Sequence, residues 1–269
     1  MIYIDKLKQH SRFRAYESLE KLSDDNPFKK FEGLTPHEFI KENFSSIASN
    51  IEVLLDYLVE HIQEIVFVKY YVDKLQKEYW FCLYDLGVDE DGERRYCIGG
   101  ESQTQTSISE ELQTKTNLDT FPDELQQFWS IHGLWYPVLS YGKEDFDLEA
   151  LATNFYLNDI DGEVPYYTLL TLAGSDLELD EWSALSHGIC IDFDEEMEEE
   201  MEEEFEFDYF LEQHIKKGIY FSQTGTGDVI LLVKPYKEFS SLFYLSHDAC
   251  SNFYDSFWDY IIEERPKGK

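Results

Sequence analysis

Two pairs of apolar segments in this chain are each joined by a short turn that contains glycine, and helical patterns lie before, between and after them. The pairs are 80–86 with 94–98, and 218–223 with 228–233. Gly92 and Gly227 stand in the two turns, where a backbone with positive φ costs glycine little. Each pair therefore predicts an antiparallel hairpin. Because strands and helices do not alternate regularly, we expect an α+β fold and not a parallel α/β sheet.

The segment around Thr35 carries the signals of a helix start. Thr35 suits the N-cap and Pro36 the first helical position, and Glu38 completes a capping box. The apolar residues between 39 and 62 then recur with a period of about 3.6 residues. This pattern predicts either one long amphipathic helix or two helices with a break near 49–50.

The rest of the N-terminal part is mixed polar and aromatic. We expect one helix over about residues 4–22, whereas the apolar, β-branched segment 65–72 is compatible with a strand or with continued helix. The segment 99–118 is rich in Gly, Ser, Thr and Gln, which is typical of a linker. We therefore expect a helical and hairpin region at 1–105 and a second domain at 106–269.

The C-terminal part shows helix and strand patterns in mixed order. A helix is expected from Pro122 to about Ile131, with Gly133 as its stop signal. Further strands are expected at 166–172, 188–193 and 243–245, and further helices at 195–217 and 252–264.

The charge balance limits the possible partners. The chain has 22 Lys and Arg against 56 Asp and Glu, a formal net charge of −34 at pH 7. A nucleic acid or an anionic membrane needs a basic face, so we expect neither as a partner. The apolar content of 43% still predicts a folded chain with a core. The partner that this charge favours is a basic protein.

The sequence shows neither an apolar targeting segment at its start nor an apolar run of the length that spans a membrane. Its four cysteines include no Cys-x-x-Cys pair. Cys82 and Cys97 flank the first hairpin, where we expect reduced core thiols. These features together predict a cytoplasmic protein.

The segment 192–208 is strongly acidic, with Asp or Glu at twelve of its seventeen positions. Apolar residues recur there every four positions: Phe193, Met197, Met201, Phe205 and Tyr209. On a helix they share one side, so the segment predicts a helix that docks through this stripe and turns an anionic face to solvent. The carboxylates expected to bind a basic partner are Glu198, Glu199, Glu202, Glu203 and Glu206. The alternative is a solvated acidic loop with no partner.

Motifs for metal and phosphate chemistry are incomplete. The acidic turns at 89–92 and 158–162 lack the ligand spacing of a calcium loop, and the Cys and His residues lack that of a zinc site. The Gly-Thr-Gly at 225–227 precedes a predicted strand, whereas a phosphate loop precedes a helix. We therefore expect no metal, no cofactor and no catalytic residue.

Two histidine segments resemble those of the secretory acid ribonucleases. His132 stands in Ile-His-Gly-Leu-Trp at 131–135, and His187 follows Glu-Trp at 181–182. Two such histidines act as acid and base toward an RNA 2′-hydroxyl in that family. Asp180 stands where the family's second segment opens with His, and the Lys of that segment is missing. A His-dependent ribonuclease is the third alternative for the function.

Four short motifs of the C-terminal region occur in an order that is more specific than any one of them. They are Phe-Pro-Asp-Glu-Leu at 121–125 with His-Gly at 132–133, the hairpin with Gly-Asp at 227–228, the strand at 243–247, and Phe-Tyr-Asp-Ser-Phe at 253–257. Their structural residues are Pro122, Gly133, Gly227, Asp228 and Phe257. In this order the motifs resemble the SUKH superfamily, over about residues 106–265. Residues 1–105 resemble no family known to us.

The SUKH superfamily includes bacterial immunity proteins and fungal cell-wall-assembly regulators of the Smi/Knr type. The resemblance implies a mostly antiparallel sheet flanked by helices. It also implies a non-enzymatic immunity protein that neutralises a cognate polymorphic toxin, a nuclease or a deaminase, by stoichiometric and charge-complementary occlusion. The alternative that it implies is an intracellular regulatory scaffold with no toxin.

Overall fold

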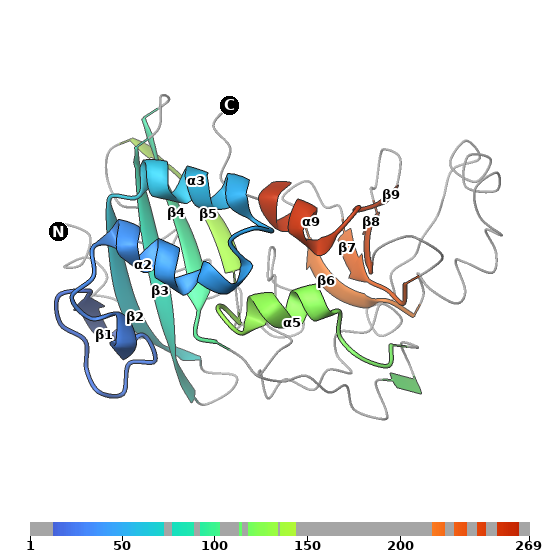
Figure 1. Cartoon of the computed structure of the whole chain (residues 1–269), viewed down its shortest axis with the longest axis horizontal. Helices are drawn as coiled ribbons and strands as arrows, with labels where there is room; N and C mark the ends of the chain where they lie inside the picture. Colours follow the sequence, from blue (N-terminus) through green and yellow to red (C-terminus); the bar gives the residue numbers. More distant parts are fainter. Residues whose placement is uncertain are drawn as a thin grey trace.

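The part of the chain that the structure describes contains two antiparallel β-sheets, with helices against and between them (Figure 1). The structure is a computed structural model. It describes residues 13–72, 77–88, 92–102, 113–114, 118–133, 135–143, 217–223, 229–235, 241–245 and 252–263.

The first sheet has five strands among these residues, in the order β1-β2-β3-β4-β5, and every neighbouring pair is antiparallel. The strands are β1 (Phe13–Ser18), β2 (Glu64–Val72), β3 (Lys77–Val88), β4 (Glu93–Gly100) and β5 (Trp135–Lys143). The segment 65–72 is therefore a strand and not a continued helix. Gly92 has a φ of +80° in the turn between β3 and β4, so the first predicted hairpin is confirmed.

The second sheet has the order β6-β7-β8-β9 within the described ranges, again antiparallel throughout. Its strands are β6 (Ile219–Gln223), β7 (Val229–Leu232), β8 (Leu242–Leu245) and β9 (Asn252–Phe253). The second hairpin and the strand predicted at 243–245 are thus confirmed. Together the two antiparallel sheets confirm the α+β class. The elements predicted at 166–172, 188–193 and 195–217 lie outside the described residues.

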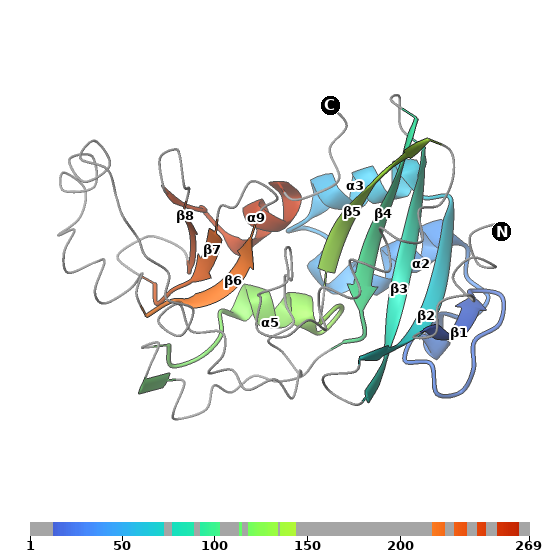
Figure 2. The ribbon, with the colours of Figure 1, turned by 180° about the vertical axis from the view of Figure 1, so that it is seen from behind.

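Helices cover one face of the first sheet and fill the space between the two sheets. The α-helices in the described ranges are α2 (Pro36–Asn43), α3 (Glu52–His61), α5 (Asp123–Trp129) and α9 (Phe257–Glu263). Helices α2 and α3 lie against one face of the five-stranded sheet, and α5 and α9 lie between the sheets (Figures 1 and 2). Helix α9 contacts both α3 and α5.

Helix α2 begins with the capping box that the sequence predicts. The Thr35 hydroxyl oxygen accepts the Glu38 N–H at 3.3 Å, and the Glu38 carboxylate accepts the Thr35 N–H at 2.9 Å. The helix ends at Asn43, and the 3₁₀ turn η2 (Ser45–Ile47) separates it from α3. Of the two alternatives for this region, two helices with a break is therefore correct.

The helix expected over residues 4–22 is wrong where the structure describes it, because residues 13–18 form β1. This strand pairs with β2, from Phe13 opposite Tyr70 to Ser18 opposite Val66. The backbone N–H and C=O groups along that side of β2 need partners, and β1 supplies them. A pairing between segments so far apart in the sequence leaves no sign in the local helical pattern.

The last helix is shorter than expected. Asn252–Phe253 form β9, and α9 begins only at Phe257. The Ser256 hydroxyl oxygen accepts the Asp259 N–H at 3.1 Å, and the Asp259 carboxylate accepts the Ser256 hydroxyl at 2.7 Å. This local cap places the helix start after Ser256.

Helix α5 begins after Pro122, as predicted, but Gly133 is not its stop signal. The helix ends at Trp129, with Ser130 as its C-cap. Gly133 lies beyond this cap, and its N–H donates to the Glu101 carbonyl at 3.0 Å. The role expected for Gly133 is therefore wrong, because its backbone joins two distant segments instead of ending the helix.

The described residues on either side of the expected boundary at 105/106 share a sheet and a core. Strand β5 pairs along β4, with Tyr136 opposite Ile98. The Phe128 ring of α5 lies 5.8 Å from the Phe257 ring of α9. Both phenylalanines belong to the same buried cluster as Phe39 of α2.

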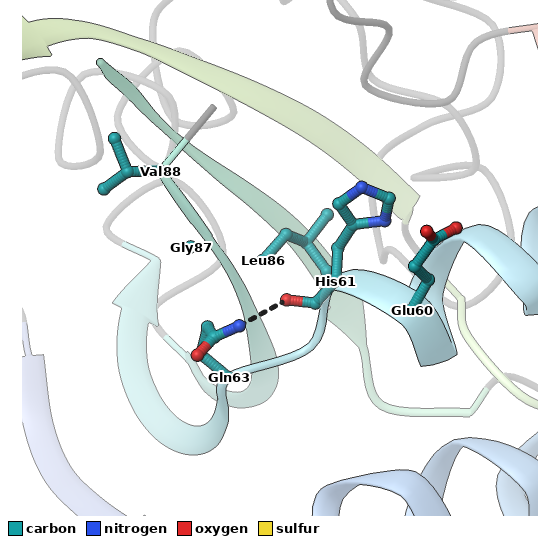
Figure 3. A pocket seen from close by; sticks show the side chains of 6 residues that line it. All are labelled: Glu60, His61, Gln63, Leu86, Gly87 and Val88. Carbon is teal, nitrogen blue, oxygen red and sulfur yellow. Dashed lines mark hydrogen bonds between the residues drawn. The ribbon is translucent and has the colours of Figure 1, made fainter. Parts of the chain in front are cut away.

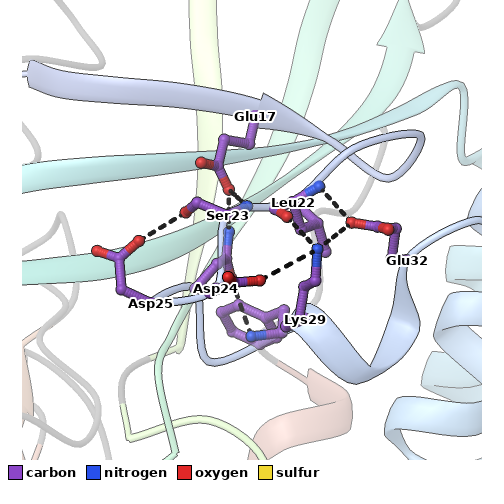
Figure 4. Close-up of polar contacts among 9 residues, drawn as sticks. Glu17, Leu22, Ser23, Asp24, Asp25, Lys29 and Glu32 are labelled. Atoms are coloured by element: carbon purple, nitrogen blue, oxygen red, sulfur yellow. Dashed lines mark hydrogen bonds and ion pairs between the residues drawn. The ribbon is translucent and has the colours of Figure 1, made fainter.

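The loop between β1 and α2 is held by hydrogen bonds within itself and to Glu17 of β1 (Figure 4). The Glu17 carboxylate accepts the Ser23 N–H at 2.9 Å. The Glu32 carboxylate accepts the Leu22 N–H at 2.8 Å and pairs with the Lys29 ammonium group at 2.6 Å. These contacts hold the loop over the core, in which the Leu22 side chain is buried.

Candidate functional site

Most of the site residues expected from the sequence lie outside the described residues. These are Glu198, Glu199, Glu202, Glu203, Glu206, Gly227, Asp228 and His187. Pro122, Gly133 and Phe257 are described, and each has a structural position: ahead of α5, bonded to Glu101, and in the core within α9. Two candidates remain: a buried cluster around His132, which was considered above as a ribonuclease histidine, and the exposed side of α3, which was not considered from the sequence.

His132 is completely buried, and partners from three elements hold its ring. Its Nδ1 lies 2.7 Å from the Gly100 carbonyl oxygen of β4, and its Nε2 lies 2.7 Å from the Tyr84 hydroxyl of β3. The Asn43 side-chain amide, at the end of α2, lies 3.1 Å from the same Nε2. Because a carbonyl oxygen only accepts, Nδ1 carries the hydrogen and Nε2 accepts. The cluster therefore ties α2, β3 and β4 together through one imidazole.

Gly99 leaves room for this imidazole. A Cβ at Gly99 would lie 2.5 Å from Cε1 and 2.6 Å from Nδ1 of His132, far inside normal contact. Position 99 therefore takes no side chain while His132 is in place. The linker expected at 99–118 would begin at Gly99, which instead belongs to β4. A glycine at the end of a predicted strand, which marks a close approach of another group, is the signal that could have found it.

Burial lowers the pKa of His132 to about 4, because the charged imidazole would lose its water. The hydrogen bond to Gly100 opposes this shift but is the smaller effect. The ring is therefore neutral at pH 7. A catalytic acid or base has to reach its substrate, and the fully buried His132 exposes no atom to one. Its geometry is that of a structural group.

The two described cysteines are also structural. Cys82 and Cys97 are buried and unbridged, so the expected reduced core thiols are confirmed. Desolvation raises the pKa of both thiols, which keeps them protonated and unreactive.

The outward side of α3 is acidic. Glu52, Asp56 and Glu60 recur every four residues, so they share one side of the helix, and all three are exposed. Within the described ranges none of them makes an ion pair or a side-chain hydrogen bond. Val53 lies beside them with 51% of its surface exposed. Since like charges four residues apart repel by a few tenths of a kcal/mol, a basic surface here would relieve that repulsion.

A pocket of about 470 Å³ opens at the C-terminal end of this acidic side (Figure 3). Its lining residues are Glu60, His61, Gln63, Leu86, Gly87 and Val88. The last three belong to an irregular part of β3, where the register with β4 shifts between Asp85 and Val88. Gly87 has a φ of +78°, and its N–H donates to the Asp85 carboxylate at 3.0 Å. At this irregularity Leu86 is buried while Val88 is 48% exposed.

The polar groups of the pocket include two hydrogen-bond acceptors, the Glu60 carboxylate and the Gln63 amide oxygen. His61 stacks on the Tyr57 ring at 4.5 Å, and its Nδ1 lies 2.8 Å from the Tyr57 carbonyl oxygen. Nδ1 therefore donates to this carbonyl, because a carbonyl oxygen only accepts. The Gln63 amide nitrogen donates to the His61 carbonyl at 3.1 Å, which leaves its own carbonyl oxygen to accept. The Glu60 carboxylate adds a negative charge.

In the part of the chain that the structure describes, no three His, Cys, Asp or Glu side chains gather as a metal site would require. No helix there has the length and apolar content to cross a bilayer. Comparison with known proteins finds no family model, no curated protein and no solved structure that matches the chain.

Proposed function

We propose that this chain is a non-enzymatic protein that binds a basic protein partner through its acidic surface. More specifically, we propose an immunity protein of the SUKH type, which neutralises a cognate polymorphic toxin with nuclease or deaminase activity. The mechanism is stoichiometric occlusion, in which the acidic surface covers the basic, substrate-binding face of the toxin.

The observation that carries this proposal is the outward side of α3. Three exposed carboxylates without ion pairs stand in a row beside an exposed valine. Long-range attraction by such a row accelerates encounter with a basic partner and discriminates against acidic ones. The apolar Val53 adds a contact that excludes water. The glutamates at 198–206 that are expected to bind the partner would add further negative charge to the binding surface.

The order of the C-terminal elements supports the SUKH assignment. Helix α5 is followed along the chain by β5, which joins the first sheet, then by the hairpin of β6 and β7, by β8 and β9, and by α9. Apart from β5, these elements carry the four motifs of the resemblance in the same order. Phe257 of the last motif is 3% exposed and packs near Phe128 of α5, as a structural motif residue should.

The other two functions draw less support from the site. A ribonuclease would need His132 to touch RNA, and this side chain is fully buried. A Smi/Knr-type regulatory scaffold would use the same acidic surface, so it differs from an immunity protein only in what happens to the partner. A test that separates these two functions has to measure the partner's activity as well as its binding.

The first step of the test is a pull-down from the source organism with the full chain. A basic protein should bind at low salt and be released at high salt. The variant Glu52→Gln, Asp56→Asn, Glu60→Gln should recover less of it. A control that removes the same number of charges elsewhere, Glu20→Gln, Glu42→Gln, Asp255→Asn, should recover a normal amount. Absence of a basic partner at low salt would contradict the proposal.

The second step is to express the recovered protein in bacteria with and without the chain. An immunity protein should restore growth when the two are present in equal amounts. A partner that binds but does not arrest growth would instead identify the regulatory scaffold.

A further inference from the structure

We infer that the pocket at the end of α3 receives an arginine side chain of the basic partner. This inference rests on the proposed function and identifies the point at which the partner is anchored. The row of Glu52, Asp56 and Glu60 leads to the pocket, so the same side of α3 attracts the partner and holds it.

The acceptors of the pocket match a guanidinium group. A guanidinium carries five N–H donors and no acceptor. The pocket offers the Glu60 carboxylate and the Gln63 amide oxygen, while one N–H of the Gln63 amide and Nδ1 of His61 are already bonded to backbone carbonyls. A donor-rich cation therefore finds a carboxylate and a carbonyl oxygen here, whereas an anion would meet the negative charge of Glu60.

The apolar residues of the pocket match the rest of an arginine. Leu86 and the half-exposed Val88 form an apolar wall beside the acceptors. The methylene groups of arginine cover such a wall while the charged end reaches polar groups. Arginine also has a flat guanidinium that lies against neighbouring side chains, which the compact ammonium group of lysine lacks. The combination favours arginine over lysine.

None of the cationic side chains that the structure describes pairs with Glu60 in the pocket. Arg95 lies beneath α3, where its Nη1 is 3.3 Å from the Tyr57 hydroxyl, but the side chain is buried and forms no ion pair with Glu60. The charge of Glu60 therefore remains available on the outside of the molecule.

The test is to titrate the full chain with a fluorescent peptide of six arginines. A peptide of six citrullines is the control, because citrulline has nearly the same shape without the charge. Glu60→Gln should weaken arginine-peptide binding about three- to fivefold, the range expected for an exposed ion pair. Val88→Lys should weaken it at least as much, since the new ammonium group competes for the acceptors. Glu20→Gln removes an equal charge from the turn after β1 and should have little effect.

The position of binding is read from amide chemical shifts. Addition of the arginine peptide should shift the backbone amide of Gly87 and the side-chain amide of Gln63. Circular dichroism checks that each variant is folded, and Glu60 and Val88 are exposed enough that both substitutions should be tolerated. Equal weakening by all three variants, or equal binding of the citrulline peptide, would overturn the inference.

Failure of the inference and failure of the proposed function give different results. A basic partner that binds the Val88→Lys variant as tightly as the wild type would exclude the pocket but leave the function intact. Peptide binding in the pocket without any basic partner in the pull-down would exclude the function and leave the pocket.

Discussion

At the scale of single residues, His132 is a polar side chain that has become part of the core. Its two nitrogens are both hydrogen-bonded, so burial leaves no polar atom of the ring without a partner. Its ring also lies 5.4 Å from that of Phe44 and 5.6 Å from that of Trp135. Removing the ring would therefore create a cavity and take one hydrogen-bond partner each from the Tyr84 hydroxyl, the Asn43 amide and the Gly100 carbonyl.

The fit between Gly99 and His132 yields a prediction. Gly99→Ala should lower the free energy of unfolding by about 3 kcal/mol, because the new Cβ overlaps the imidazole. Urea unfolding followed by circular dichroism measures this change. In a His132→Ala background the same substitution should cost much less, since the space is then open. Additive effects of the two substitutions would show that the overlap is not the cause.

The lowered pKa of His132 predicts a pH dependence of stability. The unfolded chain takes up a proton near pH 6.5, whereas the folded chain does so only near pH 4. The contribution of His132 is therefore complete above about pH 6.5 and is lost as the pH falls, by about 1.4 kcal/mol per pH unit between these values. The stability difference between the wild type and His132→Gln isolates it, because carboxylate effects cancel. A difference that stays constant from pH 7 to pH 5 would contradict this assignment.

At the scale of secondary-structure elements, starts and turns follow short-range signals, whereas the type of some elements does not. The capping box at Thr35 and the turn at Gly92 involve neighbours only a few residues apart, and both were predictable. Strand β1 has a local pattern that suggests a helix, yet it pairs with β2 across a long separation in the sequence. Local propensity is the weaker effect in such a case.

Removal of the Thr35 hydroxyl, which caps α2, should destabilise the protein. Thr35→Ala should lower the free energy of unfolding by about 1 kcal/mol, because the Glu38 N–H loses its acceptor. Thr35→Ser keeps the hydroxyl and should remain close to the wild type. Thermal or urea unfolding of the three proteins compares them, and a serine variant as unstable as the alanine variant would rule out the hydroxyl as the source.

The irregularity at the end of β3 predicts a link between backbone conformation and the pocket. Gly87→Ala should cost about 1–2 kcal/mol, because an L-residue is strained at a φ of +78°. Its Cβ would also lie 3.1 Å from the Gln63 Cγ, so arginine-peptide affinity should fall as well. Gly33→Ala is the matched control, since Gly33 has a φ of +84° and open space around it. It should lose stability but keep peptide affinity, and parallel losses of affinity in both variants would contradict the pocket assignment.

At the scale of the whole molecule, α5 and α9 connect the two sheets. The Phe257 N–H of α9 donates to the Glu124 carboxylate of α5 at 3.0 Å. Buried residues of β7 and β8, including Ile230 and Leu242, belong to the same apolar cluster as Phe39 of α2. Since one cluster spans the described parts of both sheets, neither sheet should unfold alone.

A single substitution between the sheets tests this cooperativity. Phe257→Ala should lower the free energy of unfolding by about 3–5 kcal/mol, as expected for removal of a buried aromatic ring. Unfolding curves from far-ultraviolet circular dichroism and from tryptophan fluorescence should still coincide. Val53→Ala removes an exposed apolar group and should change little. Two separate transitions in the Phe257→Ala variant would show that the sheets are independent.

Composition and local patterns were enough to predict the helix start at Thr35, two helices in place of one as one of two alternatives, both hairpins, the α+β class and the acidic character. Each of these depends on composition or on residues close together in the sequence. That residues 13–18 form a strand, that Gly99 accommodates His132 and that Gly133 joins a distant segment became clear only from the folded structure. The pocket was not predictable either, because its walls come from residues 60–63 and 86–88 and no short-range pattern relates the two. Such features depend on contacts between residues that are far apart in the sequence, and a local sequence pattern carries no information about those contacts.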